Sequence, residues 1–113
     1  MALAAARIDV SLSDRFALVR VDGYVSGPTE AELAPALDRA ASCPRIAVVF
    51  SEASLINSAG TAVLLDLLLR LRESGHEVRV AHPAAHFRRA FRITGLALEV
   101  PVFESVEAAT ADW

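Results

Sequence analysis

The sequence contains no lysine: its 11 basic residues are all arginines, and they are scattered along the chain. With 14 Asp and Glu residues, the formal net charge is −3. Proteins that bind a nucleic-acid backbone usually carry a cationic patch or stripe. The composition therefore disfavours nucleic-acid binding.

Cysteine and long apolar runs are also scarce. Cys43 is the single cysteine, so no internal disulfide can form, which favours a reducing compartment. The most apolar run, TAVLLDLLLRL, is interrupted by Asp66 and Arg70 and is too short to span a membrane. The opening MALAAAR lacks the basic region of a signal peptide. We therefore expect a soluble, cytoplasmic protein without membrane insertion.

Motifs for catalysis, phosphate binding and metal coordination are missing as well. A nucleophile elbow around Ser58 would need a glycine at position 56, which is isoleucine, and no glycine-spaced phosphate loop is present. His82 and His86 have a helical i, i+4 spacing, but neither an HExxH motif nor a cysteine pair accompanies them. We predict a non-enzymatic protein with no catalytic residue, no metal site and no cofactor.

The composition is that of a folded chain. Of the 113 residues, 54% are apolar and 22% are charged, which is typical of a globular protein rather than a disordered one. This length suits one core of ordinary size. We predict a single domain over residues 1–113.

The apolar pattern predicts an α/β fold. Alternating apolar residues at 8–12 and the run at 16–21 predict an edge hairpin, and the continuous run RIAVVF at 45–50 predicts a central strand covered on both faces. Further strands are expected at 77–81 and near 99–103. Helices are expected at 58–74, ended by Gly75, at 83–94, ended by Gly95, and after a Ser105 cap. This order predicts a mixed sheet of four to five strands with about four helices packed on it.

A first helix is predicted between the hairpin and the central strand. Thr29 and Glu32 have the spacing of a capping box, in which the two residues cap the helix start reciprocally. Pro35 lies within the same segment and removes a backbone donor, so it either kinks the helix or moves its start further along. Both possibilities remain open from the sequence.

The helix predicted after position 58 has two distinct faces and a flank. Its core face carries the apolar residues Val63, Leu64, Leu67, Leu68 and Leu71, whereas Asp66, Arg70 and Glu73 share a polar face. Leu65 and Leu69 belong to neither face. Either a neighbouring helix covers these two leucines, or they form a docking stripe for a partner protein.

The short segment INSAG, residues 56–60, raises the question of what Ser58 does. Serine is a preferred N-cap residue because its oxygen accepts a backbone N–H at the helix start. Asn57 could take that role instead, which would leave the Ser58 hydroxyl directed outward. Ala59 and Gly60 add little bulk, so another molecule could approach the helix start closely.

The stretch RIAVVFSEASLINSAGTAVLLDLLLRLRESGHEVRVAHPAAHFRRAFRITGL resembles the STAS domain of bacterial anti-sigma factor antagonists. The resemblance implies the STAS fold, and it implies that Ser58 is the phosphoacceptor for a serine protein kinase that doubles as an anti-sigma factor. It also implies a partner surface formed by the loop after the second strand and by the second helix. The residues expected there are Tyr24, Ser26, Thr29, Asn57, Ser58 and Thr61, to which Leu65 and Leu69 add a flank.

The sequence departs from the family pattern at three places. Asn57 stands where the family usually has aspartate, Ala59 replaces a second serine, and GYVS replaces an acidic Gly-Glu-Leu-Asp segment. Two hypotheses follow. The first is an anti-sigma factor antagonist switched off by phosphorylation at Ser58 and restored by a phosphatase. The second, favoured by the departures, is a STAS scaffold or transporter-associated subunit that acts by constitutive protein contact.

Overall fold

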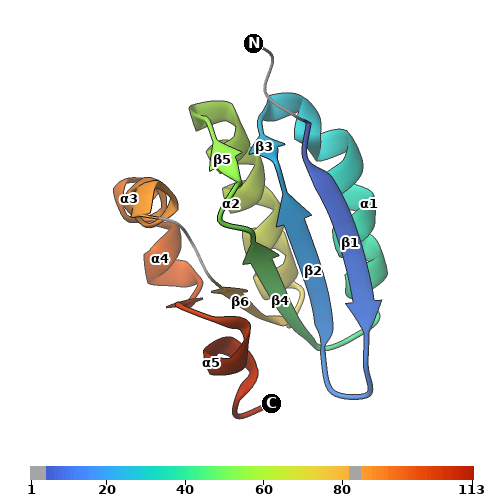
Figure 1. Cartoon of the computed structure of the whole chain (residues 1–113). Helices are drawn as coiled ribbons and strands as arrows, with labels where there is room; N and C mark the ends of the chain where they lie inside the picture. The colour runs from blue at the N-terminus through green and yellow to red at the C-terminus, as the bar shows by residue number, and fades with distance from the viewer. Residues whose placement is uncertain (1–4, 82–84) are drawn as a thin grey trace.

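Five strands form one mixed sheet in the computed structural model, which describes residues 5–81 and 85–113 (Figure 1). The strands are β1 (Arg7–Leu12), β2 (Ala17–Asp22), β4 (Arg45–Phe50), β6 (Glu77–Ala81) and β7 (Val102–Phe103), in the order β1-β2-β4-β6-β7. β1 runs antiparallel to β2, and the other neighbours are parallel. The predicted mixed sheet and its edge hairpin are confirmed.

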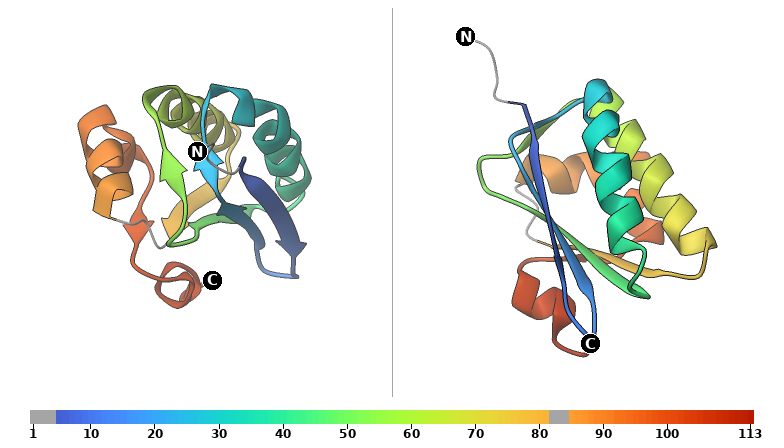
Figure 2. Two further views of the ribbon diagram at one scale, coloured as in Figure 1. Left: turned by 45° about the horizontal axis from the view of Figure 1, so that its top comes forward. Right: turned by 90° about the vertical axis from the view of Figure 1, so that its right-hand side faces the viewer.

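Helices cover both faces of the sheet. They are α1 (Glu30–Ala40), α2 (Ser58–Glu73), α3 (Ala85–Thr94), α4 (Leu96–Glu99) and α5 (Val106–Thr110), and a 3-10 turn, η1 (Gly27–Thr29), precedes α1. Figure 2 shows α1 and α2 side by side on one face, with α5 on the other. The α/β layering predicted from the sequence is therefore correct.

The central strand β4 divides the core into two clusters. Ile46, Val48 and Phe50 point into the larger cluster beneath α1, α2 and α3, whereas Ala47 and Val49 point into a smaller cluster with α5. All five side chains are buried. A strand with both faces covered reads as a continuous apolar run, which is why RIAVVF predicted this position correctly.

The smaller cluster is closed by the end of the chain. The Arg79 guanidinium donates to the Ala109 carbonyl over 2.7 Å and lies 4.5 Å from the centre of the Trp113 ring. The same guanidinium pairs with Asp112 and holds the pKa of that carboxyl below its usual range. Ser105 caps α5 by accepting the Ala108 N–H, as the sequence predicted. This covering completes the second face of β4.

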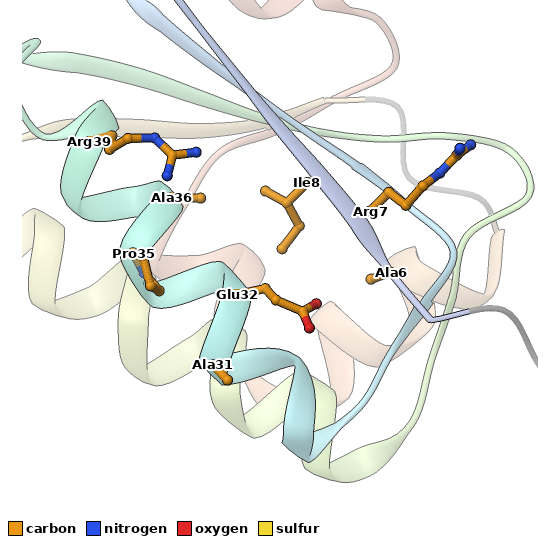
Figure 3. Close-up of a pocket in the computed structure, with 8 residues that line it drawn as sticks. All are labelled: Ala6, Arg7, Ile8, Ala31, Glu32, Pro35, Ala36 and Arg39. Carbon is orange, nitrogen blue, oxygen red and sulfur yellow. The ribbon is translucent and has the colours of Figure 1, made fainter.

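The start of α1 differs from the predicted capping box. Thr29 belongs to the 3-10 turn, and its hydroxyl accepts the Ser26 N–H over 2.8 Å. Glu32 instead points into a shallow groove between α1 and β1 (Figure 3). The helix begins at Glu30, so the exposed Pro35 lies inside it rather than delaying its start. Thr29 and Glu32 have the spacing of a capping box, but Thr29 forms its hydrogen bond with the preceding Ser26 instead.

Candidate functional site

A second, two-stranded parallel sheet brings the loop after β2 beside the start of α2. It consists of β3 (Tyr24–Val25) and β5 (Leu55–Ile56), and its outer bonds run from the Leu55 N–H to the Gly23 carbonyl and from the Asn57 N–H to the Val25 carbonyl. These bonds measure 3.0 and 3.1 Å. The sequence did not predict this pair, because two-residue strands have no detectable period.

A polar network fixes the loop that leads into β5. Ser51 donates its hydroxyl to Asp22, Ser54 lies 3.0 Å from the Ser51 hydroxyl, and the buried Ser54 hydroxyl donates to the Val21 carbonyl over 3.0 Å. The hydrogen bond from Ser51, with a further one from Arg7, lowers the pKa of Asp22. The approach to α2 is therefore held to the end of β2 by side chains as well as by backbone.

Asn57 is the N-cap of α2. Its side-chain oxygen accepts the Gly60 N–H over 2.7 Å, and its backbone carbonyl accepts the Thr61 hydroxyl over 2.9 Å. A side-chain cap of this kind stabilises a helix by about 1 kcal/mol. Of the two arrangements that the sequence left open, the structure has the one in which Asn57 caps.

Ser58 is consequently released from the capping role. It is the first residue of α2 and is exposed, and within the described chain its hydroxyl forms no hydrogen bond. Backbone N–H groups at a helix start carry partial positive charge, so an anion placed on this side chain would be tolerated. The site presents a free hydroxyl at a position that accepts negative charge.

Gly60 sets the close packing beneath Ser58. A Cβ atom at position 60 would lie 2.3 Å from the Val25 carbonyl oxygen and 3.0 Å from the Ser26 nitrogen. Only glycine permits the first turn of α2 to approach β3 this closely. Because Gly60 has no side chain, the start of α2 packs directly against β3, and these two segments carry the predicted partner surface.

A groove opens beside Ser58 between α2 and α3. It has a volume of about 400 Å³ and is lined by Ile56, Asn57, Ser58, Thr61, Ala90, Ile93 and Thr94. Ile93 is 77% exposed and Leu55, at the preceding strand, is 41% exposed. No lining residue is charged. The groove is an apolar surface with a free hydroxyl at its edge.

The contribution of α3 to this groove was missed from the sequence. Phe87 and Phe91 indicated the core face of the helix, and both are buried. Ile93 comes two residues after Phe91 and therefore does not lie on the core face of the helix. A large apolar side chain outside that face was the available signal for a surface site. Arg89 and Arg92 are also exposed on α3, although neither lines the groove.

The other predicted partner residues divide into two groups. Tyr24 and Ser26 are half-buried beside the start of α2, whereas Thr29 and Thr61 are only 5% and 4% exposed. The two buried threonines hold the local backbone and offer little surface to a partner. Asn57 is half-buried and lines the groove.

The flank of α2 lies away from the groove. Leu65 is partly buried against the main core, and Leu69 borders a separate hollow with Arg72 and Glu99. Neither leucine lines the groove beside Ser58. A docking role for Leu65 and Leu69 stays a prediction, and the packing of Leu65 favours the alternative in which neighbouring elements cover it.

The possible metal pair cannot be placed. His82 and the side chain of His86 lie outside what the structure describes. Among residues 5–81 and the described side chains from 87 onward, no group of three His, Cys, Asp or Glu side chains could hold a metal ion. Across the same part of the chain, no helix is both long enough and apolar enough to span a membrane.

Residues 7–109 match the STAS domain family, and the chain belongs to that family. Solved structures with the same fold include an anti-sigma factor antagonist from Mycobacterium paratuberculosis, at 21% identity, 95% coverage of this chain, 92% coverage of that chain and a TM-score of 0.80.

Two solved forms of the anti-sigma factor antagonist SpoIIAA are also similar. Its unphosphorylated form has 15% identity, coverage of 96% and 94% of the two chains and a TM-score of 0.68. The phosphorylated form, from Bacillus, has 16% identity, coverage of 94% and 97% and a TM-score of 0.59. Comparison with curated proteins by sequence gave no significant match.

Proposed function

We propose that this protein is a non-enzymatic signalling module, an anti-sigma factor antagonist that binds a serine kinase acting as an anti-sigma factor and is switched off by phosphorylation of Ser58. One observation carries the proposal: Asn57 caps α2, so Ser58 is exposed with its hydroxyl free. The STAS fold and the structural likeness to anti-sigma factor antagonists support it.

A phosphate on Ser58 would act on the interface rather than on the fold. It adds about −1.5 to −2 charges near neutral pH, and a helix N-terminus stabilises such a charge. The modified domain therefore keeps its structure. A partner packed over the groove would instead have to desolvate the phosphate against an apolar surface, which weakens the complex.

In the proposed interface, the groove beside Ser58 is the central contact area. Interface energy concentrates in buried apolar contacts surrounded by polar residues that exclude water. Ile56 and Ile93 supply apolar side chains, and Ser58, Asn57 and Thr94 supply polar groups around them. We infer that the partner places an apolar side chain in this groove and directs acidic groups toward Arg89 and Arg92.

Phosphorylation is tested directly by incubating the protein with a kinase of this class, magnesium and ATP. We expect an intact-mass increase of one phosphate that peptide mapping places on Ser58, and none in Ser58→Ala. An Asn57→Asp variant keeps a capping oxygen and restores a carboxylate beside the hydroxyl. Modification of another residue, or of Ser58→Ala to the same extent, would contradict the assignment.

Ile93→Glu is expected to weaken partner binding at least about tenfold, because a carboxylate would replace an apolar side chain and lose its water in the contact. Leu98→Glu is the matched control, since Leu98 is 89% exposed but does not line the groove. Binding measured by calorimetry should change only in the first variant. Equal effects of the two substitutions would show that the groove is not the contact surface.

A second candidate is a STAS scaffold or transporter-associated subunit that binds its partner constitutively. Asn57 favours it, because an amide cannot supply the carboxylate that a phosphotransfer site would use. Tyr24 and Ser26 also leave the neighbouring loop without acidic groups. A stable complex with no phosphate on Ser58 after exposure to kinase and ATP would select this function over the first.

A further inference from the structure

β1 is the outermost strand of the main sheet, and one of its two edges is free. It pairs with β2 along one edge. Along the other edge, no strand of the described chain supplies hydrogen-bond partners for the backbone of its six residues. An exposed strand edge is a ready template for pairing with a strand of another molecule. The free edge of β1 is therefore a candidate contact surface.

The side chains of β1 alternate between two faces of the sheet. Ile8 and Val10 are half-buried and pack against the larger core cluster, whereas Arg7 and Asp9 are exposed on the opposite face. If β1 pairs antiparallel with its own copy so that Ile8 lies opposite Ile8, Arg7 of each copy lies opposite Asp9 of the other. Unlike charges directly opposite each other stabilise a strand pair. The strand is thus complementary to itself in this register.

The other antiparallel registers lack this complementarity. Centring the strand pair one residue earlier or later places Arg7 opposite Arg7 or Asp9 opposite Asp9, and like charges in these positions are destabilising. Centring it at Val10 gives neither charge an unlike partner. Arg7 also pairs with Asp22 over 3.2 Å, but a guanidinium has five N–H donors and can bond a second carboxylate. The charges therefore favour the register centred on Ile8.

The groove between β1 and α1 carries a second self-complementary pattern (Figure 3). Glu32 and Arg39 line it, with Pro35 and Ala36 between them on α1 and Ile8 across from them on β1. Both charged side chains are exposed, and neither forms an ion pair with a described residue. The two-fold rotation that pairs β1 with its copy also places the two α1 helices antiparallel on one face of the sheet. Glu32 of each copy then faces Arg39 of the other.

The strand pattern and the helix pattern share one centre. Ile8 lies midway between Arg7 and Asp9, and it lines the same groove as Pro35 and Ala36, which lie midway between the charges of α1. A single two-fold axis therefore matches both sets of charges.

We propose that this protein forms a symmetric dimer in which β1 pairs antiparallel with β1 of a second copy, with Ile8 at the two-fold axis. The main sheet then runs continuously through both copies, and its exposed edge is covered. The groove beside Ser58 is bordered by α3, which lies at the other side of the sheet from β1 (Figure 1). Both grooves stay open in the dimer, so its formation is independent of the proposed phosphorylation.

Sedimentation equilibrium of the full chain tests the association from about 1 μM to about 1 mM, the range of Kd values for contacts of ordinary to low affinity. The mass should rise from 12.1 kDa toward twice that value. Asp9→Arg and Arg7→Asp each create two like-charge pairs at the centre, so each should weaken dimerisation at least about tenfold. An equimolar mixture of the two variants should dimerise as the wild type does, because every pair in the mixed dimer is again of unlike charges.

Glu73→Arg is the matched control. It makes the same change in net charge as Asp9→Arg, at an exposed residue of α2 that borders a hollow with Leu69 and Glu99. This variant should dimerise as the wild type does. Equal weakening by Glu73→Arg and Asp9→Arg would overturn the proposal, since net charge rather than β1 would then control association. A wild type that stays monomeric over the whole range would overturn it, and so would a mixture that dimerises no better than its components.

Amide hydrogen exchange of the wild type keeps the proposal testable if a variant does not fold. The N–H groups of β1 that point away from β2 gain partners only in the dimer. Their exchange should slow at least about tenfold between the monomeric and the dimeric end of the concentration range, because each must wait for the strand pair to open. Dimer formation with unchanged exchange in β1 would place the contact elsewhere and overturn the proposal.

Discussion

Ser58→Glu is expected to lower the affinity for the anti-sigma kinase about a hundredfold, a loss of about 2.7 kcal/mol. The carboxylate places a negative charge at the edge of an apolar groove, where a bound partner would exclude water and leave the charge unpaired. Ser58→Ala removes only an exposed hydroxyl and should bind as the wild type does. Titration calorimetry of the three proteins measures the difference.

Thermal unfolding separates an interface effect from a folding effect in these variants. Both should melt close to the wild type, because the side chain at position 58 is exposed and a carboxylate at a helix start is favourable. If Ser58→Glu bound the kinase with wild-type affinity, the phosphorylation switch would be wrong. The groove could then still be the contact surface, which the Ile93 and Leu98 pair tests separately.

Gly60→Ala is expected to destabilise the domain by about 3 kcal/mol and to lower the melting temperature by about 10 °C or more. The added Cβ would lie 2.3 Å from the Val25 oxygen and 2.6 Å from the Val25 carbonyl carbon, both backbone atoms. Relief requires α2 to move away from β3, which breaks the bond from the Asn57 N–H to Val25. Calorimetric unfolding measures the loss, and partner binding should fall with it.

Helix propensity alone gives this substitution the opposite sign. Alanine in a helix interior is favoured over glycine by about 1 kcal/mol, so an unconstrained site would be stabilised. Ala62→Gly, the reverse exchange at an exposed position of the same helix, is the matched control and should cost about 1 kcal/mol. An increase in melting temperature for Gly60→Ala would show that α2 and β3 are not closely packed.

Much of the fold could be predicted from local patterns. The run at 45–50 indicated a doubly covered strand, Gly75 indicated the end of α2, and Ser105 indicated the cap of α5. Each of these features depends on residues within one or two turns of each other. The prediction at Thr29 was wrong because a 3-10 turn precedes α1: Ser26 is the N-cap of that turn, and Thr29 is its partner in a capping box there.

The candidate site was predicted in part. INSAG located the exposed helix start, and Asn57 was one of two possible caps. The direction of the Ser58 side chain could not be derived, because both caps satisfy the same backbone donors. The burial of Thr29 and Thr61 could not be predicted from the sequence either, since short polar residues at a helix start show no periodic pattern. Ile93 entered the site only through the packing of α3 beside α2.

By itself, the sequence determined the order of the five main-sheet strands and of helices α1, α2, α3 and α5, the buried central strand and the position of a serine at a helix start. Apolar periodicity and capping residues encode these features locally. Only the tertiary structure decided that β3 pairs with β5 and that α3 forms one side of a groove beside Ser58. Those contacts join residues about 30 apart in the chain, and their geometry depends on how the whole core packs.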